Sequence, residues 1–474
     1  MDRLRRISPG RIMRPKKVSD VHDLNSRKKP RLNTQPLPSP IRTCGKVFSN
    51  GATIELFQGT GAGGPLRLHF FDGKRATIAP QVQFNGRLYR PAEFSSSIRR
   101  VVKFPQECMP FGSTTRLFAA IQQLFTSHGF LEAVAAAATY FIFATWFIGA
   151  SPIAPALFIT GSRLEASLLL QLLGCLVRRP LPLAEVTRHG LCSLPMKLLP
   201  TLLISADQIR PAAMGLLRTS SRRNAFFPLR DGLVDFFCAK AVYSGDIADN
   251  DFLGEGALHV NVAPFRGPLP LLEEEYAKEV TKKFQSQLLA YRCRYILDVR
   301  ESKFDVPELT PGTRMLARVF GAPIVDASAL QAGLTRLLQD HEENKLELLW
   351  TDLRCVVLEA ALHHCHKEPG ERVQVGSITK TVNAILKGRG EAKEREAREI
   401  GFHLKGLGLI AKRKGPGWGI LLDSAVCRHI HGLAHGFGLL AMRKGEARCQ
   451  QCHSTVNGIK ARNGRASESE KKHA

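Results

Sequence analysis

Residues 153–181 read IAPALFITGSRLEASLLLQLLGCLVRRPL, a run that starts as a short apolar stretch and continues with helical periodicity. The apolar stretch 156–160 is typical of a strand buried on both faces, and residues 164–176 predict the helix that follows it. Further strand patterns at 200–204, 236–243 and 258–262 alternate with helical segments, and residues 270–345 read as largely helical. We therefore expect an α/β fold with a mostly parallel sheet followed by a helical lid.

The charge of the 474-residue chain is concentrated at its two ends. The formal net charge is +25, of which residues 1–43 carry +9, residues 350–474 carry +10 and the long middle only +6. Basic ends attract polyanions, and nucleic acid is the commonest of these, although a basic solvated tail remains an alternative. A hydrophobic content of 44% excludes a wholly disordered chain. Eleven scattered cysteines and no signal-peptide pattern favour reduced thiols and a cytoplasmic location.

The N-terminal part divides into a basic arm and a β-rich segment. Residues 1–43 have almost no apolar periodicity and predict a disordered arm, whose RKKPR run at 27–31 reads as a nuclear-localisation patch or a DNA-seeking arm. Residues 44–108 predict strands joined by turns at Asp72-Gly73 and Asn85-Gly86. The stretch GTGAGG at 59–64 matches the dinucleotide fingerprint, but Pro65 and a strand follow it, which indicates a hairpin loop.

Residues 133–162 contain no charged side chain. By length this stretch is a membrane-span candidate, with an anchor at 133–150 as one alternative. Pro152 and Pro155 interrupt it, and the flanks lack a positive-inside asymmetry. We expect a buried helix followed by a core strand, and no membrane partner.

The junction after strand 156–160 is where a phosphate-binding loop would lie. Aligning Gly161 with the first loop glycine places Ala166, Ser167 and Leu168 where glycine, lysine and Ser/Thr are needed. The strand ending at 204 is followed by Ser205 and Ala206, and Asp207 is the remaining acidic residue. We therefore predict a degenerate nucleotide site without catalytic residues, at these positions: Gly161, Ser162, Ser167 and Asp207.

Four segments in order then suggest a family: IAPALFITGSRLEASLLLQLLGCLVRRPL, LLPTLLISADQ, FFCAKAVYSGD and LLAYRCRY. Over residues 110–425 the chain resembles the P-loop ATPases of phage- and plasmid-type bacterial replication, helicase-like proteins with a C-terminal winged helix. In that family the loop binds ATP and the acidic strand end holds Mg²⁺. The resemblance implies a P-loop NTPase-like core with a helical lid at 109–348. Because the nucleotide motifs depart from the family pattern, it also implies weak or no hydrolysis, with ATP and Mg²⁺ binding both in question.

Residues 349–424 have the pattern of a winged helix-turn-helix. Helices are predicted at 350–364 and 391–407, with a strand at 373–375 and a helix capped by Ser377 between them, and a hairpin at 409–422 closes the unit. The cations expected to contact DNA are Lys393, Arg395, Arg398 and Lys405 on the third helix and Lys412, Arg413 and Lys414 at the hairpin tip. Protein contact remains an alternative, because four glutamates dilute the third helix: Glu391, Glu394, Glu396 and Glu399.

The C-terminal residues are rich in cysteine and histidine. Residues 425–453 predict a helix with a zinc site. Cys449 and Cys452 would form one half of it and two of Cys427, His429, His431 and His435 the other, with His431 and His435 at the i, i+4 spacing of one helix face. The spelling CQQCH at 449–453 also matches a haem-attachment motif, which needs export, and thiols and histidines without metal are the third alternative. Residues 454–474 predict a disordered polar tail.

The sequence thus favours a DNA-associated protein of replication or mobile-element type. Its core would be a retired ATPase and its partner DNA, with a homo-oligomer left open. The alternatives are an active DNA-stimulated ATPase with an unorthodox loop, a regulatory DNA-binding adaptor and a membrane-anchored protein. No arrangement of Ser, His and Asp or of paired carboxylates supports a hydrolase.

Overall fold

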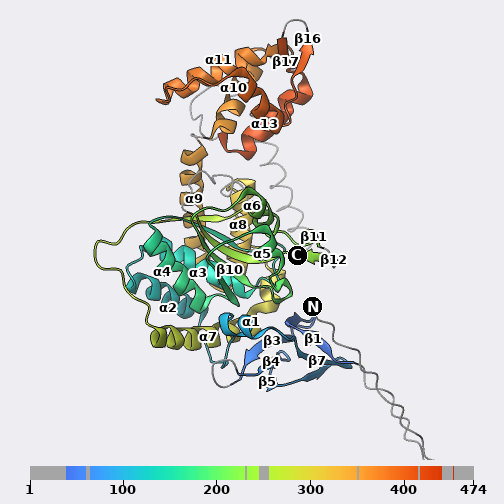
Figure 1. Ribbon diagram of the computed structural model, residues 1–474, viewed down its shortest axis with the longest axis vertical. Coiled ribbons are helices and arrows are strands. Elements are labelled where there is room, and N and C mark those ends of the chain that lie inside the picture. The colour runs from blue at the N-terminus through green and yellow to red at the C-terminus, as the bar shows by residue number, and fades with distance from the viewer. Residues whose placement is uncertain are drawn as a thin grey trace, which may run out of the picture. The chain divides into compact units, whose positions relative to one another are not determined.

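The computed structural model describes residues 39–59, 64–229, 232–244, 256–349, 352–414, 417–439 and 452 (Figure 1). Chain contacts separate Met1–Ser39 from Pro40–Ala474, and the elements named below belong to the second unit. The arm predicted at residues 1–43 lies mostly outside the described residues. Its last residues form β1 (Ile41–Thr43), which pairs in parallel with β7 (Arg87–Pro91), so the β-rich segment includes residues before the expected boundary at residue 44.

The β-rich segment forms two small sheets. One is antiparallel, in the order β2 (Gly45–Val47), β3 (Thr53–Gln58), β4 (Leu66–Phe71) and β5 (Ala76–Ala79); the other places β7 between β1 and β6 (Val82–Phe84), and α1 (Ser96–Val101) follows. Asp72 Oδ1 accepts the backbone N–H groups of Lys74 and Arg75, both at 2.7 Å, which closes the β4–β5 turn. Asn85 and Gly86 have φ of 49° and 70°, as a tight hairpin turn requires. Both predicted turns are confirmed, whereas residues 60–63 lie outside the described part.

The core is a five-stranded parallel sheet, which confirms the α/β prediction. Its order is β14 (Leu258–Val262), β8 (Ala156–Gly161), β13 (Ala239–Ser244), β10 (Thr201–Ala206) and β9 (Pro180–Leu183). The connections contain α4 (Arg163–Leu176), α5 (Arg188–Cys192), η1 (Met196–Leu198), α6 (Pro211–Thr219), β11 (Phe226–Leu229) and β12 (Gly232–Asp235). The predicted strand 236–243 is shorter in the structure, where β13 begins at Ala239. Residues 236–238 are buried but do not pair with a neighbouring strand of the sheet.

The helices that precede and follow the sheet strands in the sequence contribute buried side chains to the same hydrophobic core as the sheet. They are α2 (Thr114–Ser127), α3 (Glu132–Trp146), α7 (Glu274–Glu301), α8 (Pro311–Gly321), η3 (Ala322–Ile324) and α9 (Ser328–Leu349). Almost every side chain of α3 is buried, and α3 contacts α2, α7 and α8. The expected buried helix before a core strand is therefore confirmed. Across the described ranges, no helix combines the length and the apolar character that crossing a membrane requires. Residues 270–345 are largely helical, as expected, and their role as a lid stays a prediction.

A buried ionic cluster joins the β-rich segment to the core. The carboxylate of Glu55 on β3 accepts hydrogen bonds from Arg178, Arg179 and Arg292, with N–O distances of 2.8 Å to each. All four side chains are less than 6% exposed. Burial alone would raise the pKa of Glu55, but the three guanidinium groups outweigh it and hold that pKa far below its usual range.

The C-terminal elements surround an apolar core of their own. They are α10 (Leu353–Lys367), β15 (Arg372–Gln374), α11 (Val375–Gly388), α12 (Ala397–Gly406), β16 (Lys412–Lys414), β17 (Gly417–Leu421) and α13 (Ser424–Gly436). The strands form an antiparallel sheet in the order β15-β17-β16. Val357, Val382, Ile400 and Ile420, from three helices and β17, all belong to the buried cluster.

Two predicted boundaries in this region are wrong. Ser377 does not cap the second helix, because β15 runs directly into α11 and Gln374 takes the cap position. The third helix begins at Ala397 rather than Glu391. The Asn383 amide accounts for the later start: it accepts from the Arg395 backbone N–H at 2.9 Å and donates to the Arg395 carbonyl at 3.1 Å. These two bonds hold the chain before α12 in a non-helical path.

Candidate functional site

Gly161 and Ser162, two of the predicted nucleotide residues, lie at the point of the sheet where open parallel folds bind ligands. From β8 the chain crosses to the β9 edge, whereas from β13 it crosses to the β14 edge. The crevice outside the carboxyl ends of two adjacent strands with opposed connections is the usual ligand position. Gly161 ends β8 and Ser162 follows it, so both residues lie at the carboxyl end of one of these two strands.

The junction between β8 and α4 has no room for a phosphate-wrapping loop. β8 ends at Gly161 and α4 begins at Arg163, so Ser162 alone links them. Ser167 lies within α4 and is half-buried. A phosphate-binding loop needs several consecutive residues whose N–H groups converge on the anion, and one residue cannot supply them.

A carboxylate takes part in the hydrogen bonding at this helix N-terminus. The Glu165 side chain accepts hydrogen bonds from the Ser162 hydroxyl and from the Phe265 backbone N–H, the latter at 2.9 Å. These two bonds lower the pKa of Glu165, that of Ser162 contributing most. Glu165 is therefore ionised at neutral pH, and its negative charge opposes the binding of a second anion in the first turn of α4.

Asp207 is paired with a cation from α4. The Arg163 guanidinium lies 2.9 Å from the Asp207 carboxylate, and each side chain is 67% exposed. An exposed pair of this kind adds little stability. The pair nevertheless places an arginine beside the acidic residue predicted for this site.

Gly161 has a packing role in this junction. Its φ is +99°, and a Cβ built on it would stand 2.2 Å from the Val262 carbonyl oxygen on β14. The close approach of β8 to β14, where Ser162 N–H donates to the same carbonyl at 2.8 Å, explains the glycine without a ligand.

We expect Gly161→Ala to destabilise the core by about 2 kcal/mol or more, because the added methyl group strains both the backbone torsion and the β14 contact. Gly215→Ala is the control: Gly215 lies in α6, and a Cβ added there would meet no atom within 4 Å, so alanine adds only helix propensity. Thermal unfolding of both variants measures the difference. Equal melting temperatures would contradict the packing role.

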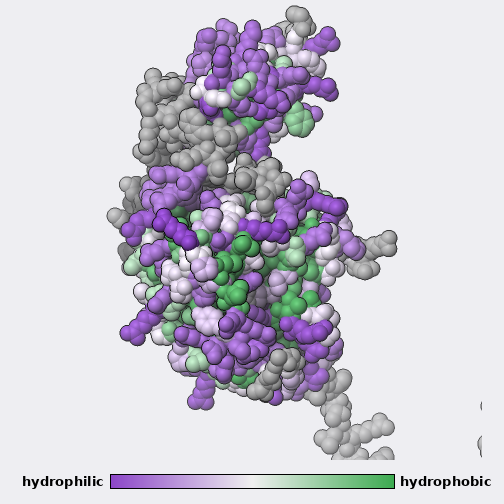
Figure 2. All heavy atoms as spheres, turned by 60° about the vertical axis from the view of Figure 1, so that its left-hand side comes forward, coloured by the Kyte–Doolittle hydropathy of each residue, from purple (hydrophilic) through white to green (hydrophobic). Residues whose placement is uncertain are grey.

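The predicted DNA-contacting cations lie in the C-terminal elements, and most are exposed. Lys393, Arg398, Lys405, Lys412 and Arg413 all have exposed side chains, whereas the side chain of Lys414 lies outside the described part. On the face of the molecule shown in Figure 2, the surface of this region is mostly hydrophilic. These cations can therefore meet a polyanion without displacing other groups.

Arg395 differs from the other predicted cations. Its guanidinium pairs with Glu391 and, at 3.1 Å, with Glu399, and it is half-buried. The positive charge of Arg395 is thus balanced by carboxylates of the protein itself. The same pairing neutralises two of the four glutamates that dilute this segment.

Two exposed aromatic side chains accompany the cations, and sequence reasoning missed both. Phe402 on α12 is 75% exposed and Trp418 on β17 is 58% exposed. Phe402 lies halfway between the buried Ile400 and Leu404, so the helical period could have indicated that it faces away from the core. Trp418 is the cross-strand partner of Arg413.

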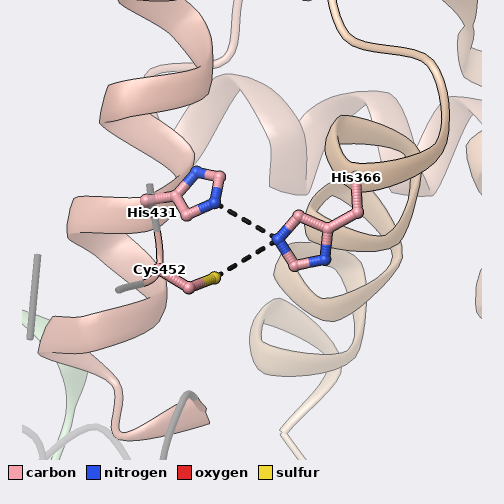
Figure 3. Close-up of side chains that lie close together, drawn as sticks. All are labelled: His366, His431 and Cys452. Atoms are coloured by element: carbon pink, nitrogen blue, oxygen red, sulfur yellow. Dashed lines mark hydrogen bonds between the residues drawn. The ribbon is translucent and has the colours of Figure 1, made fainter. Parts of the chain in front are cut away.

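The cysteine and histidine residues come together in a different combination from the predicted one. His431 on α13 and Cys452 meet His366 on α10, which the sequence analysis did not single out (Figure 3). His366 Nε2 lies 3.2 Å from His431 Nε2 and 3.4 Å from Cys452 Sγ. His435 is not part of this group, and Cys449 lies outside the described residues.

No protein-family model matches the chain, and no curated protein matches it. Among solved structures, it is similar to the apo A form of the NrS-1 C-terminal region, with 10% identity, 78% of this chain and 96% of that chain covered, and a TM-score of 0.30. It is also similar to a chain of the Drosophila ORC bound to DNA (12% identity, 70% and 88% covered, TM-score 0.17) and to the Aeropyrum pernix ORC2 protein (12% identity, 65% and 94% covered, TM-score 0.18). TM-scores of this size do not establish a shared fold.

Proposed function

We propose that this chain is a DNA-binding protein of replication or mobile-element type, in which a winged helix contacts DNA and an ATPase-like core has lost hydrolysis. The observation that carries the proposal is the set of exposed cations on α12 and β16: Arg398, Lys405, Lys412 and Arg413.

The order of the C-terminal elements supports a winged helix. Helix α10, strand β15, helices α11 and α12, and the hairpin β16–β17 follow each other along the chain and share one apolar core. In helix-turn-helix proteins the later helix enters the major groove, and α12 holds that place here. β16 and β17 form the wing, which supplies cations for phosphate contacts.

The charge distribution around α12 favours a polyanion as the partner. Arg398 and Lys405 flank Phe402 on the helix at spacings of four and three residues, so the three side chains share one outward face. The pairing of Glu391 and Glu399 with Arg395 removes two negative charges that would repel phosphate. The Asn383 clamp on Arg395 fixes the chain entering α12 before any DNA arrives, which lowers the ordering cost of binding.

Three independent observations on the core support the proposed absence of hydrolysis. A single residue links β8 to α4, Glu165 adds negative charge in the first helical turn, and Arg163 pairs with Asp207. The first two remove requirements of phosphoryl transfer, namely a loop for the phosphates and a positive environment. The third gives the remaining acidic residue a cation as its partner. The core then serves as a scaffold.

We expect the purified full chain to release no phosphate from ATP above the background rate, with or without DNA. A ligand that binds only the folded state raises the melting temperature. Because we expect no nucleotide binding, ATP with Mg²⁺ should leave the melting temperature of the chain unchanged. Asp207→Ala is the diagnostic variant, since it removes the remaining acidic residue. DNA-stimulated phosphate release that Asp207→Ala abolishes would contradict the proposal and favour an active ATPase with an unorthodox loop.

A further inference from the structure

We propose that His366, His431 and Cys452 bind one zinc ion that joins α10, α13 and the segment carrying Cys452. The three side chains come from three places in the sequence and point toward one another (Figure 3). None of them is among the cations proposed to contact DNA, so the site stands apart from the proposed function.

The distances fit a common cation. A tetrahedral Zn²⁺ at about 2.05 Å from nitrogen and about 2.3 Å from sulfur sets two nitrogen ligands about 3.3 Å apart, and a nitrogen and a sulfur ligand about 3.6 Å apart. The observed separations are 3.2 Å between the two Nε2 atoms and 3.4 Å between His366 Nε2 and Cys452 Sγ. All three donor atoms lie within 4.8 Å of one another. The two separations that involve His366 therefore match two edges of one tetrahedron.

The tautomer of His431 is fixed for metal binding by its own helix. His431 Nδ1 lies 2.7 Å from the Cys427 carbonyl oxygen one turn earlier, and a carbonyl only accepts, so Nδ1 carries the proton. In the neutral ring Nε2 then carries a lone pair directed at His366. This arrangement, a ligating histidine whose other nitrogen donates to a backbone carbonyl, is the usual outer shell of a zinc site.

The donor set indicates zinc, and the burial favours a structural ion. Two imidazoles and one thiolate suit zinc, whereas Mg²⁺ and Ca²⁺ prefer oxygen ligands. His431 is 2% exposed and Cys452 is 1% exposed. A buried ion bound by residues from separate segments cross-links them, and its binding free energy adds to folding. Zinc would thus fasten Cys452 to the helices of the winged-helix region.

The test measures metal on the untagged full chain. We expect about one zinc per chain by elemental analysis. Replacement with Co²⁺ should give the visible bands of a tetrahedral site together with a thiolate charge-transfer band in the near ultraviolet. Metal-free protein that also takes up no Co²⁺, or a Co²⁺ spectrum without the thiolate band, would overturn the proposal. These readouts need no DNA, so they are independent of whether the winged helix binds it.

Variants then identify the ligands. His366→Ala and Cys452→Ser should each lose the zinc or bind it far more weakly, while His435→Ala, on the same helix as His431 but outside the group, should keep the full equivalent. Retention of one zinc by folded His366→Ala would overturn the assignment. If a ligand variant does not fold by circular dichroism, the Co²⁺ spectrum of the unaltered chain decides.

Discussion

Reversing four exposed charges, with Arg398→Glu, Lys405→Glu, Lys412→Glu and Arg413→Glu combined, is expected to weaken binding of duplex DNA by roughly 100-fold at physiological salt. Each cation that neutralises a phosphate releases counterions, so its loss also makes the salt dependence shallower by about one unit of the log–log slope. The side chains are exposed, and their replacement should leave the fold intact. Fluorescence anisotropy at several salt concentrations measures both quantities.

The matched control reverses four exposed charges outside the C-terminal elements. Lys74 and Arg75 lie in the β4–β5 turn and Arg99 and Arg100 in α1, and all four are replaced by glutamate in one variant. We expect this variant to lose much less affinity, since the effect of net charge alone is long-range and screened. Equal losses in the two variants, or unchanged affinity in the first, would show that α12 and the wing do not contact DNA.

Glu55→Ala is expected to cost the core about 3–5 kcal/mol of stability, because it leaves the guanidinium groups of Arg178, Arg179 and Arg292 buried without their common carboxylate. A loss of this size should abolish or strongly lower the thermal transition of the core, which differential scanning calorimetry measures. The packing of β3 against the core should loosen first, because Glu55 is the residue through which β3 binds all three arginines.

Glu93→Ala provides the exposed counterpart. Glu93 pairs with Arg42, both largely exposed, and its loss should cost less than about 1 kcal/mol. The contribution of Glu55 to stability also depends on pH. Because the pKa of Glu55 is depressed in the folded state, that contribution is complete above the unfolded-state pKa and is lost as pH falls through the folded-state pKa. Equal effects of the two substitutions would contradict the buried network.

Much of the fold was predictable because local patterns and burial agree. The strand at Leu258–Val262 and the helix after Gly161 follow from apolar runs of the right length. The Asn85-Gly86 turn follows from the positive φ that these residue types tolerate. The parallel sheet could then be inferred from the alternation of strand and helix.

The candidate sites were less predictable because they depend on contacts between distant residues. His366 is 65 positions from His431, and no spacing rule links them. The late start of α12 depends on a side-chain clamp from Asn383, which periodicity does not report. The one-residue link between β8 and α4 depends on the approach of β14 to Gly161, again a contact made only in the fold.

The most direct test of the central claim is a titration of labelled duplex DNA with the full chain, in the presence and absence of ATP and Mg²⁺. We expect salt-dependent binding with the same affinity in both conditions, as follows from the proposal that the winged helix supplies the contacts and that the core has no working nucleotide site. DNA binding that requires ATP, or that changes severalfold when ATP and Mg²⁺ are added, would contradict it.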